Sequence, residues 1–431
     1  MLFQPRNLWV GIIGVLAINL CGCATYSPRP LDDVPFRERA KTQTIGKVRV
    51  TVAALRERES KKLFAVSLAK QNIQPVWVEV QNDDDVPYLL LQLDLDPFYY
   101  SPLEVSYKNR LKFLPAARKK MDEHFERSAF YEFIAPGTVS SGFVFASLDE
   151  GSKAVTVSLL GPQRLKRFNF IVEVGDIRMD YQEVDFDALY DEDEIVHCDE
   201  TELRDAIRGL PAATKNKKGT KLGDPLNLII VADMNTLFSV FIRAGWDETE
   251  TLYSRSARVT AGAFLFRKKY RYSPIGPLFV FGRSQDLALQ KARDTIDERT
   301  HLRLWMTNMR FEGKPVWFGQ ISRDIGVRFT RHTWNLTTHK IDPDIDSERW
   351  YLIQDLIATQ GIARIGFVGG VGAATFHEPR KNLTGDPYYT DGLRVVMFLT
   401  DETVSLKQLR FLDWEFPPTA EEFRAEWLSR N

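Results

Sequence analysis

Short runs of alternating apolar and polar residues constrain the fold of the first half of the chain more than any other feature. They follow one another at regular spacing from Ile45 onward, separated by turn-forming stretches such as Asn82–Asp85 and Pro136-Gly137. Alternation with a period of two predicts strands that bury one face, because successive side chains of a strand point to opposite sides. We expect strands at Val48–Val52, Val76–Val80, Tyr88–Leu95, Phe130–Ile134, Gly142–Ala146, Ala154–Leu160 and Phe168–Val174.

The spacing of these runs also indicates how the strands are arranged. The connections are tight, and about seven short strands over ~130 residues are typical of two packed sheets. Residues 45–175 are therefore predicted to form a β-sandwich, immunoglobulin-like in broad architecture. Within it, the basic stretch Leu111–Phe125 predicts a helix.

The pattern changes beyond Asp176. The acidic block Asp185–Glu194 predicts a linker over residues 176–199. From residue 200 to 431, strand and helix patterns alternate, which predicts an α/β or α+β domain in a multidomain chain. The expected strands are Leu226–Val231, His301–Met306, Val316–Gln320, Ile362–Val368 and Leu393–Leu399, and the expected helices are Glu200–Arg208, Asn235–Ala244 and Ser347–Thr359.

The N-terminus has the pattern of an export signal. Arg6 precedes the apolar run Leu8–Leu20, which has the length of a secretory signal core and is shorter than the ~20 residues that span a bilayer. The sequence Leu20-Cys21-Gly22-Cys23 follows, and it resembles the bacterial lipobox. The resemblance implies that residues 1–22 are removed as a signal peptide and that Cys23 is the lipid attachment site. An ordinary secretory signal is the alternative.

The lipobox resemblance also implies where the protein lies. Each buried acyl methylene contributes ~0.8 kcal/mol, so two or three chains hold a protein on a membrane almost permanently. Ala24, rather than Asp, follows the cysteine, which by the enterobacterial sorting rule favours the outer over the inner membrane. We therefore expect a lipid-anchored, periplasm-facing protein of the cell envelope, with residues 23–44 as a tether between lipid and fold.

Charge and cysteine content exclude several classes of function. The formal net charge is −1 and there is no long basic run, so we expect no nucleic-acid partner. After processing, Cys198 is the one unmodified cysteine, which excludes an intramolecular disulfide and a cysteine-based zinc site. The expected partners are the membrane, through the anchor, and an envelope protein, a glycan or a lipid headgroup.

Several motifs of the second domain occur together in a known family. They are Gly223–Asn227, Ala244–Trp246, Phe281–Ala288, His301–Trp305, Val316-Trp317, Arg323-Asp324 and Thr338–Asp342, with Asp346, Glu348 and Arg349. Jointly they resemble the LssY-like C-terminal domain, from Leu210 to near Asp401. The family is associated with the bacterial envelope and has no established activity, so the resemblance implies a location but no mechanism.

Imidazoles and carboxylates are concentrated between His301 and Arg349, and they suggest a metal site. His301, Asp324 and His339 would be the ligands of a divalent metal, because two imidazoles and one carboxylate leave a coordination position open for water. Asp346 and Glu348 would supply a catalytic base or fourth ligand. The alternative is structural: acidic residues cap helices and form turns, and a buried histidine is often hydrogen-bonded.

Arginines of the same domain suggest an anion site. Arg283, Arg303 and Arg349 could together bind a phosphorylated or carboxylated headgroup, because guanidinium groups hold such anions through two parallel hydrogen bonds. Salt bridges within the domain are the alternative. Two functions follow from these patterns: a non-catalytic binding or structural role without cofactor, and a metal-assisted hydrolase acting on an envelope phosphoester or lipid-headgroup substrate.

Overall fold

The computed structural model describes residues 25–149, 152–174, 181, 184–248, 275–292, 299–329 and 337–419. The chain forms two compact units, Met1–Gly175 (unit 1) and Asp176–Asn431 (unit 2), which are described separately below. The predicted signal peptide and Cys23 lie outside the described residues. None of the helices within the described ranges is both long and apolar enough to cross a membrane.

Unit 1 contains two four-stranded sheets, and every strand pair in them is antiparallel. The first sheet has the order β1 (Lys41–Ile45), β2 (Val48–Ala54), β3 (Ile73–Asn82) and β6 (Thr138–Ser147). The second has the order β5 (Phe133–Ile134), β4 (Tyr88–Leu91), β7 (Ser152–Gly161) and β8 (Arg164–Glu173). One core joins the two sheets, with Val50 and Val78 from the first and Val157 and Phe168 from the second.

A layer of helices covers the other face of the first sheet. Trp77, Phe143 and Phe145 alternate with the residues of the first core and join a second core. This second core includes side chains of α2 (Glu57–Phe64), α4 (Pro102–Asn109) and α5 (Pro115–Ser128). Phe64 and Phe125 stack within it at 4.9 Å between ring centroids. The central strand β3 of the first sheet is therefore buried on both faces, whereas the edge strand β1 is largely exposed. The predicted immunoglobulin-like architecture stays a prediction.

Two expectations for unit 1 differ from the structure. The run Tyr88–Leu95 was expected to be one strand, but the strand ends at Leu91 and a short helix, α3 (Gln92–Leu95), follows. Residues 25–44 do not form the free tether predicted from their composition. Tyr26, Val34 and Phe36 are buried in the second core, within a segment that contains η1 (Leu31–Asp33) and η2 (Pro35–Arg39). Three apolar side chains are enough to attach this segment to the fold, although their spacing is neither that of a strand nor that of a helix.

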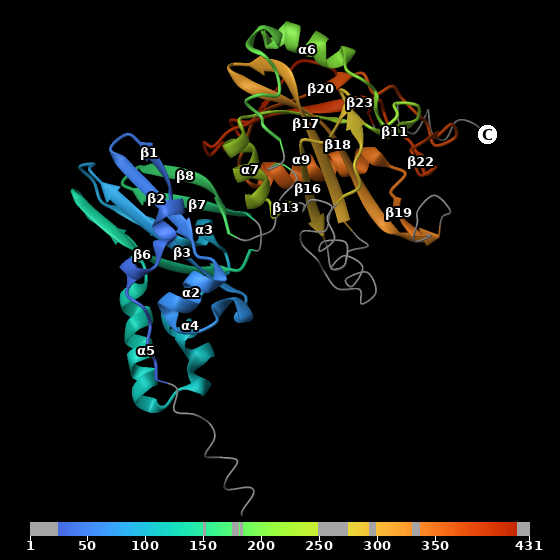
Figure 1. The fold of residues 1–431 in the computed structure, drawn as a ribbon. Coiled ribbons are helices and arrows are strands. Elements are labelled where there is room, and N and C mark those ends of the chain that lie inside the picture. Colours follow the sequence, from blue (N-terminus) through green and yellow to red (C-terminus); the bar gives the residue numbers. More distant parts are fainter. Residues whose placement is uncertain are drawn as a thin grey trace, which may run out of the picture. The chain divides into compact units, whose positions relative to one another are not determined.

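Unit 2 is built on a large mixed sheet (Figure 1). Its main path is β13 (Asp247–Glu248), β16 (Leu287–Ala292), β17 (Arg299–Phe311), β18 (Lys314–Phe329), β12 (Leu228–Val231), β23 (Leu393–Leu399), β20 (Ile362–Gly369) and β24 (Arg410–Phe411). β19 (Thr337–Ile341) pairs with β18, and β9 (Val196–Cys198) pairs with β17. At the centre, β12 runs antiparallel to β18 and parallel to β23, and all four residues of β12 are buried.

Helices cover both faces of this sheet. On one face, α6 (Glu200–Gly209) packs Leu203 and Ile207 against Ile229 and Val396. The intervening residues of β12 point to the opposite face, which α7 (Met234–Arg243) and α9 (Ile345–Ala358) cover. These three helices match the three predicted ones to within two residues at each end. The described part of the predicted acidic linker belongs to unit 2, because it contributes β9 to the sheet.

Two smaller elements lie beside the α6 face and were not predicted. A four-stranded sheet has the order β11 (Leu222–Pro225), β10 (Ala213–Lys215), β14 (Phe279–Val280) and β15 (Arg283–Ser284). A two-stranded hairpin is formed by β21 (Arg380–Lys381) and β22 (Pro387–Tyr388). Val280 of the small sheet and Leu278, which directly precedes β14, share a core with Trp305 and Phe318 of the large sheet. The small sheet thus covers part of the face that carries several predicted site residues.

Candidate functional site

His301 and Asp324 lie on neighbouring strands and contact each other directly. β17 and β18 pair with Thr300 opposite Arg323, which places His301 and Asp324 diagonally on the same face. His301 Nε2 is 2.6 Å from Asp324 Oδ2, and their side chains are only 8% and 4% exposed. The structure therefore brings together two of the three predicted metal ligands.

The environment of His301 determines its protonation. Burial lowers the pKa of His301 to about 4; Asp324 opposes this shift and the Arg299 guanidinium adds to it. The imidazole is therefore neutral at neutral pH, and its contact with Asp324 is a hydrogen bond to a carboxylate rather than an ion pair. Since the ionised carboxylate accepts, the proton lies on Nε2. Nδ1 is then an acceptor, buried without a hydrogen-bond partner among the described residues. Such an oriented neutral imidazole can act as a base or a metal ligand.

The rest of the predicted metal site is not assembled in the described part of the chain. The backbone of His339 pairs with Val327 at the edge of the sheet, but its side chain lies outside the described residues. Among the side chains that are described, no three of His, Cys, Asp or Glu are placed to hold a metal ion.

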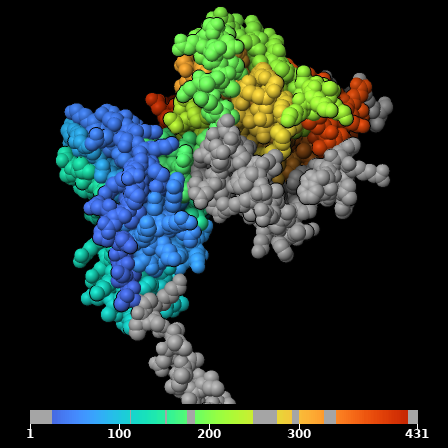
Figure 2. Space-filling view, in the orientation of Figure 1, coloured from blue at the N-terminus to red at the C-terminus, as the bar shows by residue number. Residues whose placement is uncertain are grey.

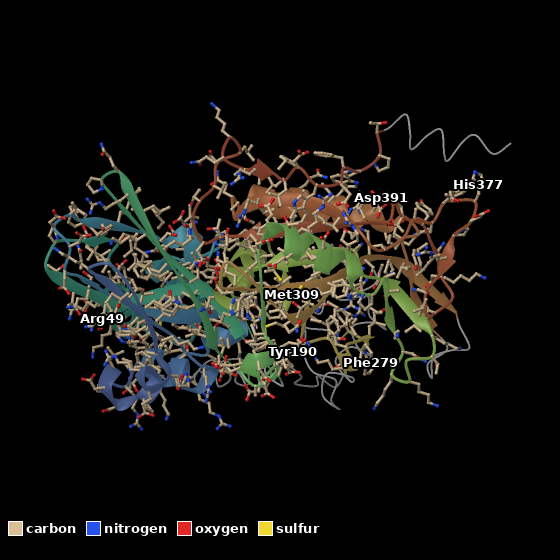
Figure 3. All side chains as sticks on the ribbon, turned by 90° about the horizontal axis from the view of Figure 1, so that it is seen from above. Arg49, Tyr190, Phe279, Met309, His377 and Asp391 are labelled. Carbon is tan, nitrogen blue, oxygen red and sulfur yellow. The ribbon has the colours of Figure 1, made fainter. Side chains whose placement is uncertain are left out.

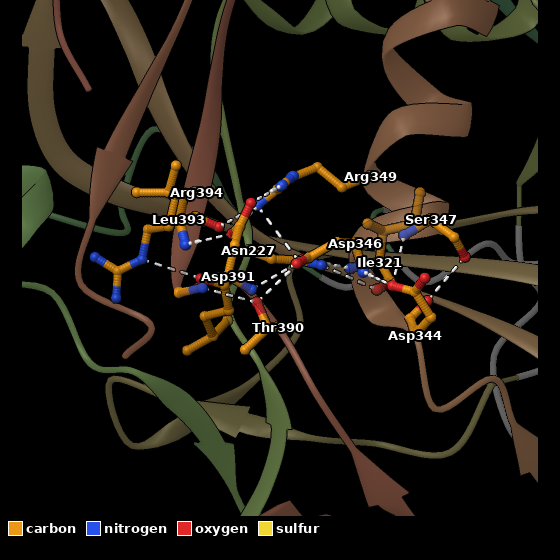
Figure 4. Close-up of polar contacts among 12 residues, drawn as sticks. Asn227, Ile321, Asp344, Asp346, Ser347, Arg349, Thr390, Asp391, Leu393 and Arg394 are labelled. Carbon is orange, nitrogen blue, oxygen red and sulfur yellow. Dashed lines mark hydrogen bonds and ion pairs between the residues drawn. The ribbon is translucent and has the colours of Figure 1, made fainter. Parts of the chain in front are cut away.

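Asp346 takes part in a buried network at the start of α9 (Figure 4). It accepts hydrogen bonds from Thr390 Oγ1 at 2.8 Å and from the Asp391 backbone at 2.6 Å. Burial raises the pKa of Asp346 to about 6, although Arg349 opposes the shift. The helix is capped by Asp344, whose side chain accepts from the backbone of Asp346 and Ser347. Asp346 therefore connects α9 to the segment before β23.

Arg349 completes this network and is fully buried. Its guanidinium binds both carboxylate oxygens of Asp391, at 2.9 and 2.6 Å, and donates to the Leu393 carbonyl at 2.7 Å. Asp346 lies 3.4 Å away. Two carboxylates of the chain thus already occupy Arg349, so it offers no free face to an external anion.

Glu348 is buried in a separate pair. Arg323 Nη2 donates to Glu348 Oε1 at 2.9 Å, and the Arg323 guanidinium lies 5.2 Å from the ring centroid of Tyr351. Burial raises the pKa of Glu348, and the Arg323 hydrogen bond opposes the shift. The two predicted catalytic acids, Asp346 and Glu348, thus bind different arginines. Among the described residues, neither of them has a hydrogen bond or ion pair with His301.

Arg303 belongs to a buried polar layer between the large sheet and the small one. Its guanidinium donates to Gln320 at 2.9 Å and to the Gly276 carbonyl at 3.1 Å. Asp224 is buried in the same layer, where burial raises its pKa, Arg303 opposes the shift, and Asn382 donates to it at 2.9 Å. The partners of Arg303 could not be predicted, since they come from distant parts of the sequence.

Arg283 is held by its own neighbours. It binds both oxygens of buried Asp286 at 2.8 and 3.0 Å, and it donates to Tyr190 Oη at 3.1 Å and to the Met306 carbonyl at 2.6 Å. The three predicted anion-binding arginines therefore have separate partners and do not converge on one site.

Two adjoining cavities lie at the edge of the small sheet, and Phe281 contributes to both. One, of about 500 Å³, is lined by residues that include Tyr190, Arg283 and Met309. The other, of about 310 Å³, is lined by residues that include Lys215, Lys217 and Phe279. Figure 3 labels Tyr190 and Met309, which line the first cavity, and Phe279, which lines the second. In Figure 2, the yellow segment with β14 and β15 is flanked by green segments that precede it in the chain. We call this pair of cavities the Phe281 groove.

Phe281 has an unusual backbone for a bulky residue. It lies with Gly282 in the turn between β14 and β15, at φ 52°, and Gly282 has φ 78°. Asn-Gly would adopt this turn without strain, whereas a left-handed conformation costs a bulky residue ~1 kcal/mol or more. The ring is 42% exposed, and one side packs 6.0 Å from the Phe318 ring. The sequence signal was a phenylalanine directly before a turn glycine, which the pattern of strands and helices does not identify.

The buried pairs and most of the groove lie in the region that resembles a known family, whereas Tyr190 of the groove precedes it. Residues 207–393 match the family model described as LssY C-terminus. Unit 2 therefore carries an LssY-like domain. The match includes Phe281, His301, Asp324 and Arg349 and leaves unit 1 outside. Comparison with curated proteins gives no match to the chain. The LssY-like domain thus holds every predicted site residue except Cys23.

Proposed function

We propose that the chain is an envelope lipoprotein, anchored through Cys23, whose LssY-like domain binds an amphiphilic anionic ligand in the Phe281 groove without catalysis. The observation that carries the binding role is the half-exposed side chain of Phe281, which lies between two cavities on a strained backbone. Backbone strain of this kind persists at sites where a side chain must be presented in a fixed direction.

The groove has the chemistry expected for such a ligand. Phe279, Phe281 and Met309 provide apolar surface for an acyl or other hydrophobic portion. Lys215 and Lys217 provide positive charge on one wall. The charge of Arg283 is already balanced by Asp286, so we assign recognition of the anion to the two lysines. A lipid headgroup with a short apolar portion fits both features.

The interior pairs support binding over catalysis. Asp346 lies beside the buried Arg349, and Glu348 pairs with the partly exposed Arg323, so removing either carboxylate would leave a cation of the fold without one of its partners. The two arginines connect α9 to β18 and to the segment before β23. A rigid scaffold suits a preformed binding groove, because little conformational entropy is lost when the ligand binds.

The test is a calorimetric titration. The chain from Ala24 to Asn431 is titrated with dihexanoyl phosphatidylglycerol below the micellar concentration of this lipid. Dihexanoyl phosphatidylcholine is the control ligand. We expect saturable binding of the anionic lipid, with the Kd raised about tenfold or more by Phe281→Asn and several-fold by Lys215→Gln with Lys217→Gln. Leu406→Asn, which removes an exposed apolar side chain elsewhere in unit 2, should leave the Kd unchanged. Equal affinity for both lipids, or no effect of Phe281→Asn, would refute the proposal.

A second candidate is the metal-assisted hydrolase of an envelope phosphoester or lipid headgroup. The observation that favours it is the buried Nδ1 of His301, which has no hydrogen-bond partner among the described residues and belongs to an imidazole oriented by Asp324. With Asp324 orienting the ring through Nε2, Nδ1 of His301 and a nitrogen of His339 would hold a divalent metal that activates water. Metal analysis of the purified chain tests this. A stoichiometric metal whose removal by chelation lowers the Tm, and which is lost in His301→Gln, would support the hydrolase over the binding protein.

A further inference from the structure

The end of the α4–α5 hairpin carries an exposed apolar surface. Leu103, Tyr107 and Leu111 are spaced four residues apart, which places them along one side of α4 and the following 3-10 turn η4 (Arg110–Lys112). Leu114 follows directly before α5. Their exposed fractions are 49%, 65%, 89% and 54% in chain order. We call these four side chains the tip surface. Large apolar residues gathered in this way mark an interaction site rather than ordinary surface.

Basic residues are concentrated in the segment that carries the tip surface. Between Pro102 and Lys120 the sequence has six basic residues and one acidic one, Glu104. Lys119 and Lys120 are exposed on the first turns of α5. The Arg110 guanidinium lies 4.8 Å from the ring centroid of Tyr107, so positive charge lies directly beside the exposed apolar residues. Apolar and aromatic side chains within a ring of Lys and Arg are the composition of a surface that lies on an anionic bilayer.

The hairpin end is held in shape by internal contacts. Arg118 donates to the carbonyls of Arg110 at 3.0 Å and Phe113 at 2.7 Å, which fixes the turn between the helices. Ser106 of α4 donates to Asp122 of α5. The tip surface is therefore presented by a rigid support, and its residues need little ordering when they bind.

The start of the described chain lies at the same end of unit 1. Tyr26 Oη is 2.6 Å from His124 Nδ1 of α5, and the Tyr26 ring packs 5.7 Å from the Phe113 ring in a T-shaped contact. Figure 1 shows the blue beginning of the described chain running along α5 toward the end of the hairpin. Cys23 precedes Tyr26 by three residues, which extend to at most ~11 Å.

We propose that the α4–α5 tip surface of unit 1 docks onto an anionic phospholipid bilayer beside the lipid on Cys23. The inference rests on the proposed anchor for its geometry, because the short connection to Tyr26 holds the tip surface at the membrane. Leu111 and its apolar neighbours enter the interfacial layer, while Lys119 and Lys120 contact phosphate groups. Unit 1 then lies on the membrane rather than at the end of a tether.

The experiment uses the chain from Ala24 to Asn431, which keeps every described residue and lacks the lipid. It is sedimented with vesicles of phosphatidylcholine containing phosphatidylglycerol, and with vesicles of phosphatidylcholine alone. We expect binding to the anionic vesicles that Leu103→Ser with Tyr107→Ser and Leu111→Ser lowers about tenfold or more. Lys119→Glu with Lys120→Glu should lower it about fivefold per residue. The matched control, Leu406→Ser with Phe416→Ser in unit 2, should leave it unchanged.

The outcomes separate the docking surface from the anchor. Equal sedimentation of the parent, triple-serine and charge-reversed chains overturns the docking surface, whatever lipid Cys23 carries. Because the charge-reversed chain changes only exposed residues, its result stands even if the triple variant unfolds. Palmitate labelling of the full chain, compared with Cys23→Ser, tests the anchor itself. Absence of label with intact vesicle binding refutes the anchor and leaves the docking surface standing.

Discussion

In unit 1 the conspicuous basic and apolar side chains of the α4–α5 hairpin lie on the surface, whereas in unit 2 the arginine Arg349 lies inside and is paired with acids. Leu111 and Lys119 are exposed, while Arg349 and Glu348 are fully buried. The same residue types therefore have different uses. Exposed charge next to exposed apolar surface is available to a partner, but buried charge that is already paired serves the fold.

The largest expected effect tests whether the buried pairs of unit 2 are structural. Arg349→Ala leaves Asp391 and Asp346 buried without their cation, so we expect a loss of about 3–5 kcal/mol in the free energy of unfolding. Urea unfolding followed by tryptophan fluorescence measures it. Asp32→Ala is the matched control, because it breaks the surface pair with Arg37 in which Asp32 is 89% exposed. It should cost less than about 1 kcal/mol. Similar losses in unfolding free energy for Arg349→Ala and Asp32→Ala would show that the buried pair stabilises the fold no more than the surface pair.

A second variant tests the close packing of unit 1. A Cβ on Gly142 would lie 2.5 Å from the Phe130 backbone nitrogen and 2.6 Å from the Ala129 carbonyl carbon. Backbone atoms cannot move aside as a flexible side chain does, so Gly142→Ala should destabilise the chain by up to about 3 kcal/mol. Gly209→Ala, where a Cβ meets no atom within 4 Å, should have no measurable cost. A stable Gly142→Ala chain would show that the segment after α5 does not pack on β6.

A third prediction concerns pH and the neutral His301. Its folded-state pKa of about 4 lies below the value of 6.5 of an unperturbed histidine. Between these values the unfolded state binds more protons, so the stability that His301 contributes is present above pH 6.5 and decreases as pH falls toward 4. From pH 7 to 5 this amounts to about 2 kcal/mol. Urea unfolding at pH 7 and at pH 5 should show this additional loss of unfolding free energy in the parent chain but not in His301→Gln. An equal loss in both chains would mean that His301 is protonated in the fold.

The smallest expected effect concerns the tip surface. Leu111→Ser removes an apolar side chain that is almost fully exposed, so the free energy of unfolding should change by less than about 0.5 kcal/mol. A thermal melt beside the vesicle assay would show lowered membrane binding at unchanged stability. A clear loss of stability would instead place Leu111 in a packed environment and remove the basis for calling the tip surface available.

The predictable part of the fold is the part encoded in local sequence. Strands such as β3 and helices such as α6 and α9 follow from periodicity and capping residues within one segment. The small sheet was missed because β14 and β15 have two residues each and show no period. The role of residues 25–44 was misjudged because a few buried side chains, such as Phe36, are enough to fix a segment rich in proline and charge.

The candidate site was only partly predictable, for a related reason. The sequence identified His301, Asp324 and Arg349 as residues that could serve in a site. Whether each of them serves a site or the fold depends on the side chain with which it pairs. Asp391 lies 42 residues after Arg349, and Asp224 lies far before Arg303 in the chain. Such pairs follow from the order of strands in the large sheet, which local patterns do not contain. The exposed ring of Phe281 depends on a turn conformation and is equally hidden from pattern analysis.

The parallel pairing of β12 with β23 has a consequence for the order of synthesis. β12 ends at Val231, and its central neighbour begins at Leu393. While the chain emerges, one edge of β12 therefore stays without its partner until more than 160 further residues have been made. Unit 1 has all its strands by Glu173 and can fold first. A chain that stops before Leu393 would expose the apolar edge of β12, which is the type of edge that recruits other chains into aggregates.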